Sequence, residues 1–483
     1  MLLPNRIRIR SAAVLALLLA CVLALPLLAA PTPPADDSGA MPTPSGGAPA
    51  DRPPTAIEPA APAAPAAADA PVITVWSGPT LPVGQRGDPQ KWVNVVGNVT
   101  SAATLTSLSY TLNGGPSQPL SVGPDNMRLA RPGDFNIELD YTDLRPGNNS
   151  VIIRATDQDG GAAAATVTVN YRSGDLSWPP QTYVYDWSTV TRVAQMAQVV
   201  DGPWRLDDGG VRPTVFDFDR LLALGDLSWR DYTVTVPITV YGIDESGYTA
   251  PSNGPGVGIM VRWQGHYHVE GDGQPRTGWR RLGALGWYRW QRDGSQFTEG
   301  FEVLGNGGRL IGTTDKTLNF GVTYMFKLAV QANPDPSIPA TYRFKVWPAS
   351  SAEPALWDVE RRGFNGEPSG GGLLLLAHHV DARFGAVRVD LLNTRPRPIL
   401  TVITDGPGGG SVRLNPGPQP RFGEDVIVTA APDLGSAFVG WSGALTGAAN
   451  PGQVTLFESA TITATFSADG NGIALPIIVS SNP

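Results

Sequence analysis

The chain has 483 residues and a formal net charge of −8, with 42% hydrophobic and 16% charged residues. A single core does not extend over such a length, so about three domains are expected. The acidic balance argues against a duplex nucleic-acid partner, because phosphate binding depends on clustered Lys and Arg. Cys21 is the single cysteine, which excludes a disulfide within the chain. We therefore expect a multidomain monomer that binds no nucleic acid.

The N-terminus has the pattern of an export signal. Residues 1–30 carry Arg6, Arg8 and Arg10 and continue with the apolar run SAAVLALLLACVLALPLLAA. The run is nearly long enough to span a bilayer, so this segment is either a cleaved signal peptide or an N-terminal anchor. Cys21 lies in LLAC, which also resembles a lipoprotein box. Residues 31–70, rich in Pro and Ala, predict an extended linker. We expect a secreted or cell-surface protein that meets the membrane only through its N-terminal segment.

Residues 71–172 predict a β-sandwich. In GDFNIELDYTDLRPGNNSVIIRATDQDGG, Phe135, Ile137 and Leu139 alternate with polar residues, and RPGNN marks a turn. The segment resembles bacterial immunoglobulin-like domains, which implies two antiparallel sheets.

Residues 396–468 carry a more distinctive pattern, and 469–483 form a tail. ILTVITDGPGGGSVRLNP and VTAAPDLGSAFVGWSGALTGAANPGQVTLFESATITATF stand in order. They resemble the divergent internalin-type B-repeat of bacterial surface proteins. The expected core consists of Phe438, Trp441, Ile462, Ala464 and Phe466. Trp441 is therefore interpreted as a core residue and not as a platform for a ligand.

Residues 173–395 hold all four histidines and ten of the 13 tryptophans. Period-two alternation in DYTVTVPITVYG, and in the pair TYMFKLAV and TYRFKVW, predicts strands, the last two as a hairpin. The segment resembles concanavalin A-like and laminin G-like jelly rolls. The motifs that carry the resemblance are LLALGDLSWRDYTVTVPI, GVGIMVRWQG, YRFKVWPASSAEPALW and GGGLLLLAHHVDARFGAVRVDLL. The whole chain is therefore expected to be all-β.

The histidines of this segment are possible metal ligands. His378 and His379 are adjacent on a predicted strand, so their side chains point to opposite faces and cannot both bind one ion unless a bulge re-aims one of them. The plainer interpretation is a core strand that runs into an exposed end. His266 and His268, two residues apart, share a face, but zinc would need further ligands from the region of His378 and Asp381.

Two carboxylates are candidate catalytic groups. Asp217 and Asp219 share a strand face, and glycosidases use a pair of carboxylates. The Glu-x-Asp-x-x-Glu pattern of jelly-roll glucanases is missing from the sequence, as is a Ser, His and Asp motif context. A solvated acidic face beside Arg220 is the favoured interpretation, so the sequence favours a binding protein over an enzyme. Asp157 and Asp159 alone are too few for calcium, which takes six to eight oxygen ligands, although calcium stays open as a cofactor.

The remaining candidate is an aromatic and basic sheet face. Arg343, Lys345 and Trp347 share the face opposite the core residues of their strand, and tryptophan with basic donors suits sugars. The predicted ligand-binding residues are Arg262, His266, His268, Arg343, Lys345, Trp347 and His378. A carbohydrate or other cell-surface ligand is the expected partner. A structural adhesin or spacer without a ligand, and a jelly-roll glycan hydrolase or lyase, are the alternatives.

Overall fold

The computed structural model describes residues 69–172, 182–249, 252, 254–269, 273–279, 281–293, 296–395, 397–420 and 424–468. All of them belong to one unit, residues 66–483. Their regular structure consists of strands and short 3-10 helices, which confirms the all-β expectation. No helix within these ranges is long and apolar enough to cross a membrane. The predicted signal or anchor (1–30), nearly all of the linker (31–70) and the tail (469–483) lie outside the described residues.

The immunoglobulin-like region forms two sheets. Its strands are β1 (Val72–Val75), β2 (Thr80–Val83), β3 (Trp92–Thr100), β4 (Leu105–Leu112), β5 (Gln118–Pro119), β6 (Asp134–Asp140), β7 (Gly147–Asp157) and β8 (Ala162–Tyr171), with a 3-10 helix η1 (Tyr141–Asp143). The sheet orders are β1-β3-β6 and β2-β8-β7-β4-β5. Phe135, Ile137 and Leu139 of β6 enter the core as predicted. Asn136 and Glu138, on the opposite face of β6, are only 2% exposed. A second layer therefore covers that face.

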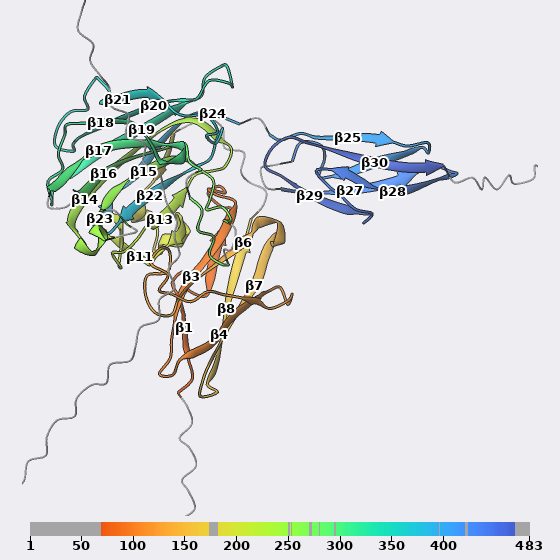
Figure 1. Ribbon diagram of the computed structural model, residues 1–483, viewed down its shortest axis with the longest axis horizontal. Helices are drawn as coiled ribbons and strands as arrows, with labels where there is room; N and C mark the ends of the chain where they lie inside the picture. The colour runs from red at the N-terminus through yellow and green to blue at the C-terminus, as the bar shows by residue number, and fades with distance from the viewer. Residues whose placement is uncertain are drawn as a thin grey trace, which may run out of the picture. The chain divides into compact units, whose positions relative to one another are not determined.

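The central region is a two-sheet sandwich, and Figure 1 labels most of its strands. The strands are β9 (Thr182–Tyr185), β10 (Gln198–Asp201), β11 (Trp204–Asp207), β12 (Gly210–Pro213), β13 (Arg220–Leu224), β14 (Trp229–Ile243), β15 (Gly256–Trp263), β16 (Ala284–Asp293), β17 (Gln296–Gly305), β18 (Arg309–Thr314), β19 (Thr323–Gln331), β20 (Thr341–Pro348), β21 (Val359–Arg362), β22 (Gly372–His378), β23 (Val380–Phe384) and β24 (Val387–Thr394). Short 3-10 helices are η2 (Trp187–Thr189), η3 (Val193–Gln195), η4 (Glu245–Tyr248) and η5 (Asn306–Gly308).

A seven-stranded sheet has the order β10-β13-β22-β15-β16-β17-β18. A nine-stranded sheet has the order β11-β12-β23-β14-β19-β20-β21, with β24 paired to β14 and β9 paired to β24. Side chains from both sheets form one large core cluster between them. This arrangement is the expected jelly-roll sandwich.

The predicted phases of β14, β19 and β20 are correct. The inward side chains of β14 are all 0% exposed: Tyr232, Val234, Val236, Ile238 and Val240. β19 and β20 pair as the predicted hairpin, with Phe326 opposite Val346 and Leu328 opposite Phe344. Phe326 and Phe344 are fully buried, with ring centroids 6.1 Å apart. Alternating apolar residues therefore place one face of each strand in the core.

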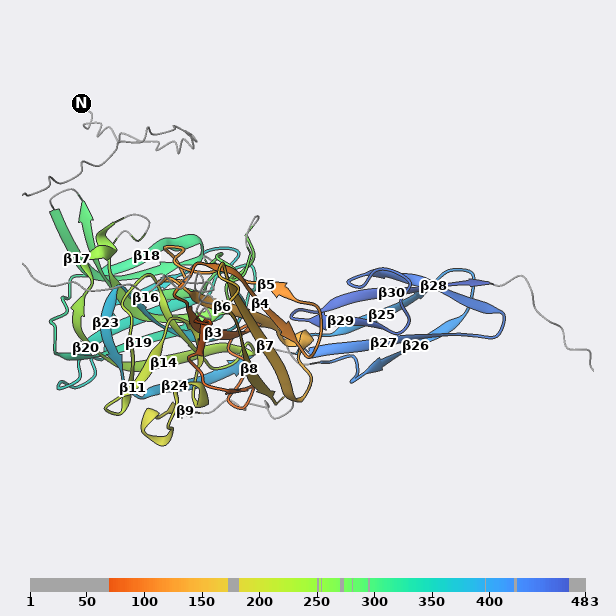
Figure 2. The same cartoon turned by 90° about the horizontal axis from the view of Figure 1, so that it is seen from below.

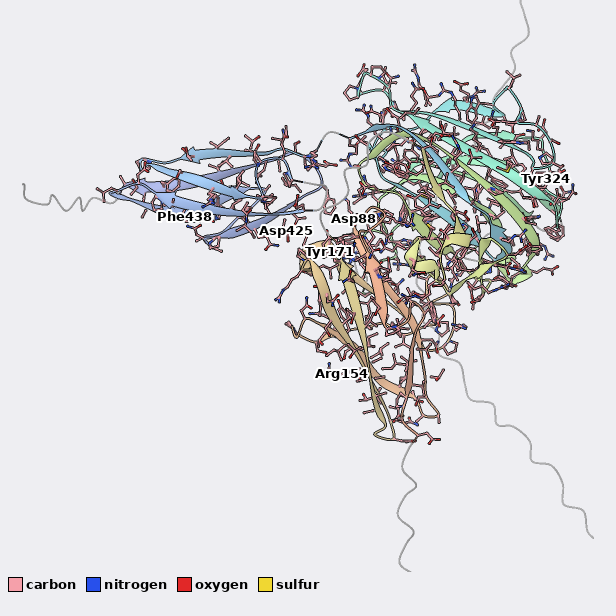
Figure 3. All side chains as sticks on the ribbon, turned by 180° about the vertical axis from the view of Figure 1, so that it is seen from behind. Asp88, Arg154, Tyr171, Tyr324, Asp425 and Phe438 are labelled. Carbon is pink, nitrogen blue, oxygen red and sulfur yellow. The ribbon has the colours of Figure 1, made fainter. Side chains whose placement is uncertain are left out.

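The C-terminal region has two three-stranded sheets, β25-β30-β28 and β26-β27-β29. Their bounds are β25 (Leu400–Asp405), β26 (Gly410–Asn415), β27 (Glu424–Pro432), β28 (Ser436–Gly443), β29 (Gly452–Leu456) and β30 (Ala460–Ala468). Figure 2 shows these six strands side by side as one group. Trp441 is 5% exposed in a separate core, and its ring centroid lies 4.9 Å from that of Phe438, which Figure 3 labels. The core interpretation of Trp441 is therefore confirmed.

A buried network of charges joins the immunoglobulin-like region to the sandwich. Arg128 donates from Nε to Asp201 of β10 at 2.7 Å and from Nη1 to Glu138 of β6 at 2.7 Å. Glu138 also accepts from the backbone N–H of Arg276 at 2.8 Å. Burial alone would lower the pKa of Arg128, but the two carboxylates outweigh it and raise that pKa. The covered face of β6 is thus the contact surface with the sandwich.

Candidate functional site

Arg262 leaves the regular alternation of β15. The pairing of β15 with β22 shifts between Val261 and Trp263, and Arg262 between them has φ 57°. Such a bulge re-aims a side chain and breaks the period of two. Arg262 is 2% exposed, and its Nε donates to the carbonyl of Arg230 on β14, in the opposite sheet, at 3.2 Å. The alternation in IMVRWQ places Arg262 outward, opposite to Ile259 and Val261, and this expectation is wrong.

Arg262 instead lines a cavity of about 330 Å³ at one end of the sandwich. The walls come from the β19–β20 loop, residues 332–340, and the β21–β22 loop, residues 363–369, while Arg230 and Arg262 contribute from β14 and β15. The lining of this cavity contains both polar and apolar side chains. Other lining side chains include Asn333, Ile338, Phe364, Asn365, Glu367 and Ser369.

Glu367 connects the two loops. Its Oε1 accepts from the backbone N–H of Ala340 at 2.6 Å and from Nη1 of Arg262 at 3.4 Å. Burial raises the pKa of the Glu367 carboxyl, although the Ala340 N–H and the Arg262 charge act in the opposite direction. Nη2 of Arg262 is buried without a hydrogen-bond partner in the described part of the chain, although it lies 3.7 Å from Oδ1 of Asp231. The cavity is therefore lined by polar groups that are not all satisfied within the protein.

A larger hollow of about 750 Å³ lies in the immunoglobulin-like region against β3, β4 and β5. Its lining consists of uncharged residues. Because specific sites combine an apolar wall with a few directed polar groups, the sandwich cavity is the stronger candidate.

Arg343, Lys345 and Trp347 lie on the face of β20 that is turned away from the sandwich core, as predicted. Other residues cover most of this face. Lys345 is 4% and Trp347 6% exposed. The Nζ of Lys345 donates to the carbonyl of Pro354 at 2.6 Å and lies 4.7 Å from the ring centroid of Trp357. Arg343 remains partly exposed, with Nε bonded to Glu360 at 2.8 Å. Because residues 349–358 run back over this face, Trp347 does not offer an open ring to a sugar.

His266 and His268 are separated. His266 is 3% exposed, and its Nε2 lies 3.1 Å from Oδ2 of Asp201, within the network that joins the two regions. Its ring also packs against Trp263, with centroids 5.1 Å apart. His268 is exposed. The alternation that would place both on one face does not hold, because both lie beyond the end of β15.

His378 and His379 are both buried, at 4% and 6% exposure, so the expected exposed strand end is wrong. His379, with φ 52°, links β22 of one sheet to β23 of the other. Asp219 is also buried, 5% exposed, and its Oδ1 lies 2.8 Å from Nδ1 of His378, so it belongs to no solvated acidic face. Burial would raise the pKa of Asp219, but His378 outweighs it and the pKa is lowered.

A serine completes a hydrogen-bonded series. The Oγ of Ser252 bonds to Nε2 of His378, whose Nδ1 contacts Asp219. This order of serine, histidine and aspartate is the one that activates a serine nucleophile. Ser252 is 9% exposed.

The possible metal ligands among the described residues do not form a cluster. The described residues contain no group of three or more His, Cys, Asp or Glu that could hold an ion. Asp157, a possible calcium ligand, accepts at Oδ1 from the N–H groups of Asp159 and Gly161 and at Oδ2 from Ser101. Its carboxylate therefore closes a turn.

Sequence reasoning identified Arg262 but not its neighbours. Arg230, Glu367 and Ser252 lie in connections or at strand ends that no periodic pattern distinguishes. The one available signal is the Gly- and Pro-rich composition of NPDPSIPA and GFNGEPSGGG, which predicts loops. Loops frequently carry binding residues, but composition does not tell which two loops meet.

Comparison with known proteins supports parts of this architecture. Residues 400–470 match the family model described as the divergent InlB B-repeat domain, which confirms that interpretation. A search of curated proteins finds no match.

Three solved structures resemble the sandwich. The exoplasmic/lumenal domain of VIP36 bound to Ca²⁺ and Man2 is 11% identical, covers 46% of this chain and 84% of its own, and has a TM-score of 0.29. The alginate lyase Aly36B is 11% identical, with coverage of 45% and 98% and a TM-score of 0.29. A galectin-like protein of unknown function from Bacillus subtilis is 10% identical, with coverage of 44% and 90% and a TM-score of 0.26.

Proposed function

We propose that this chain is an exported carbohydrate-binding protein whose central sandwich holds the sugar in the cavity beside Arg262. The observation that carries the proposal is a cavity of about 330 Å³ with a buried guanidinium in its wall. Export is supported by the N-terminal pattern of basic and apolar residues and by the B-repeat match.

The lining suits a sugar. A pyranose presents hydroxyls at its edge and C–H groups on its faces, so its site combines fixed donors and acceptors with apolar or aromatic surface. Arg230, Asn333 and Glu367 supply the polar groups, and Ile338 and Phe364 supply the apolar ones. A cavity of about 330 Å³ is at the small end of the range for ligand sites, so the end or a branch of a glycan is the expected epitope.

The test is a glycan array probed with the full exported chain, followed by calorimetric titration of the glycans that bind. Arg230→Gln should weaken binding, while Arg154→Gln should not. Arg154 is an exposed residue of β7, in the immunoglobulin-like region, and is labelled in Figure 3. Titrations with calcium and with EDTA show whether an ion contributes. If no glycan binds, or if Arg230→Gln binds as tightly as the parent, the proposal is refuted.

A second candidate, an esterase, is favoured by the Ser252, His378 and Asp219 series. The Oγ of Ser252 would attack an ester carbonyl while His378 accepts its proton and passes it to the leaving alcohol, and water would then release the acid. Since Ser252 is only 9% exposed, an ester reaches Oγ only if surrounding residues move, so binding is the better supported function. Labelling of Ser252 by a fluorophosphonate, lost in His378→Gln, would favour the esterase.

A further inference from the structure

The cavity beside Arg262 contains a cationic side chain that has no hydrogen-bond partner in the described part of the chain, whereas its carboxylate already accepts hydrogen bonds within the protein. Arg230 lines the cavity, and among the described residues its guanidinium makes no hydrogen bond or ion pair; its backbone carbonyl alone is used, by Arg262. A guanidinium presents five N–H donors in a planar fork. A ligand acceptor is therefore needed to satisfy Arg230 when water is displaced.

The carboxylates at this end of the sandwich have partners within the protein. Oε1 of Glu367 accepts from Ala340 and Arg262. Oδ1 of Asp231 accepts from the backbone N–H of Ala332 at 2.6 Å and lies 3.7 Å from Nη2 of Arg262. Arg262 is thus neutralised by the protein, but Arg230 is not. The charge left for a ligand is positive.

A third cation lies behind the β21–β22 loop. A Cβ at Gly370 would lie 2.2 Å from Cδ of Arg395, so the Arg395 side chain packs directly against the residue that follows the cavity-lining Ser369. Burial lowers the pKa of Arg395 to about 10; Glu458 opposes this, and repulsion from Arg262 and Arg230 adds to it. Arg230 and Arg262 therefore both lie near enough to Arg395 to repel it, so an anion bound by Arg230 would also be attracted by this positive charge.

We propose that the bound sugar carries a carboxylate, as in a hexuronic acid, and that Arg230 binds that carboxylate. This inference rests on the proposed function and specifies its ligand class. The planar guanidinium fork matches the two oxygens of a carboxylate, and such charge-assisted pairs are stronger than neutral hydrogen bonds. Phe364 and Ile338 would meet the C–H faces of the same sugar.

The experiment compares each acidic glycan with its own uncharged form. Oligosaccharides of galacturonic, glucuronic and mannuronic acid are titrated into the full chain, each beside its methyl ester, which keeps the sugar and removes the charge. The acid should bind at least about tenfold more tightly than the ester, because a hydrogen bond to a charged group contributes roughly that much. Added salt should weaken binding of the acid and leave that of the ester nearly unchanged.

The variants separate the two proposals. Arg230→Gln should reduce the difference between acid and ester to less than about twofold, and the exposed control Arg154→Gln should preserve it. If acid and ester bind equally tightly, the carboxylate inference is wrong while carbohydrate binding stands. If neither binds, both proposals fail. If free acetate or sulfate competes as strongly as the uronide itself, the cavity is a simple anion site and the sugar plays no part.

Discussion

Trp347 and Lys345 lie on the outer face of β20 but are covered by residues 349–358 of their own chain. A tryptophan buries about 150–250 Å² when it is enclosed, so its contribution to stability depends on the cover and not on the strand phase alone. Lys345 places its ammonium group between Trp347 and Trp357, 5.7 Å and 4.7 Å from the ring centroids. This cluster therefore stabilises the fold of the segment that follows β20.

We expect Trp347→Ala to destabilise the protein by about 3 kcal/mol, because substitution of a buried aromatic residue leaves a cavity. Phe344→Ala, in the centre of the core, should cost about 3–5 kcal/mol. Arg343→Ala, whose side chain is partly exposed, should change stability by less than about 1 kcal/mol. Denaturant unfolding of the three variants measures these differences. A stability of Trp347→Ala equal to that of the parent would mean that residues 349–358 do not cover the ring in solution.

His379 should make the protein less stable at mildly acidic pH. Burial lowers the pKa of His379, and the neighbouring His378 adds to this effect, although Asp217, Asp244 and Asp219 oppose it. The unfolded chain takes up a proton near pH 6.5, whereas folded His379 remains neutral there. The contribution of His379 is therefore fully present above about pH 6.5 and is lost as the pH falls through the folded pKa.

The measurement is the thermal midpoint between pH 7.5 and pH 5.5. His379→Asn keeps a residue that tolerates φ 52° and removes the titrating group, so its midpoint should fall less than that of the parent. His268→Asn, at an exposed histidine, serves as the control and should follow the parent. Identical pH profiles for the parent and His379→Asn would contradict the assignment.

At the scale of the strand, β15 shows what sequence can and cannot establish. The alternation of Ile259 and Val261 correctly predicts the core face, but Trp263, expected on the same face, packs in a separate cluster. The bulge at Arg262 was not predicted, because it depends on how β15 pairs with β22, more than 100 residues later in the chain. Hence the fold followed from periodicity, but the direction of the one candidate site residue that lines the cavity did not.

The connections were harder to predict than the strands. The hairpin of β19 and β20 was expected from two adjacent alternating segments, since their pairing is local. The contact between Ala340 and Glu367 joins two different loops and creates the cavity wall, and nothing local specifies it. Covering segments, such as residues 349–358, likewise change exposure without changing the strand pattern.

Two glycines of β15 have different surroundings from a glycine of β14, which gives a test of strand packing. A Cβ at Gly258 would lie 2.3 Å from the carbonyl oxygen of Gly286 and 2.4 Å from Cβ of Trp287 on β16. One at Gly256 would lie 2.5 Å from the ring of Trp287. One at Gly242 of β14 would meet nothing within 4 Å.

Gly258→Ala should therefore destabilise the protein by about 3 kcal/mol or more, because the backbone of β16 cannot move away cheaply. Gly242→Ala should be neutral or stabilising by up to about 1 kcal/mol, since it restricts the unfolded chain at an open position. Chemical denaturation of both variants measures this difference in stability. Equal stability of the two would show that β15 and β16 are not closely packed at Gly258 in solution.

At the scale of the whole molecule, the immunoglobulin-like region and the sandwich share buried polar contacts. Asn136 of β6 donates to the carbonyl of Val200 on β10 at 2.8 Å, and the indole of Trp263 donates to Gln90 at 2.8 Å. Removing Arg128 would leave Asp201 and Glu138 buried without their shared cation. Separation of the two regions would expose or leave unpaired several of these groups, so each region stabilises the other.

The last prediction concerns cooperative unfolding of the full chain. We expect calorimetry to resolve one transition for the immunoglobulin-like region and sandwich together and another for the C-terminal region, which has its own core cluster. Arg128→Met should cost about 3–5 kcal/mol, lower the first transition or split it in two, and leave the second unchanged, because a buried charge pair broken on one side leaves an uncompensated charge. Arg131→Met is the matched control: Arg131 pairs with Asp134 at 3.3 Å, but its side chain is 44% exposed, so the expected change is below about 1 kcal/mol. Separate melting of the first two regions in the parent would show that the network around Arg128 does not couple them.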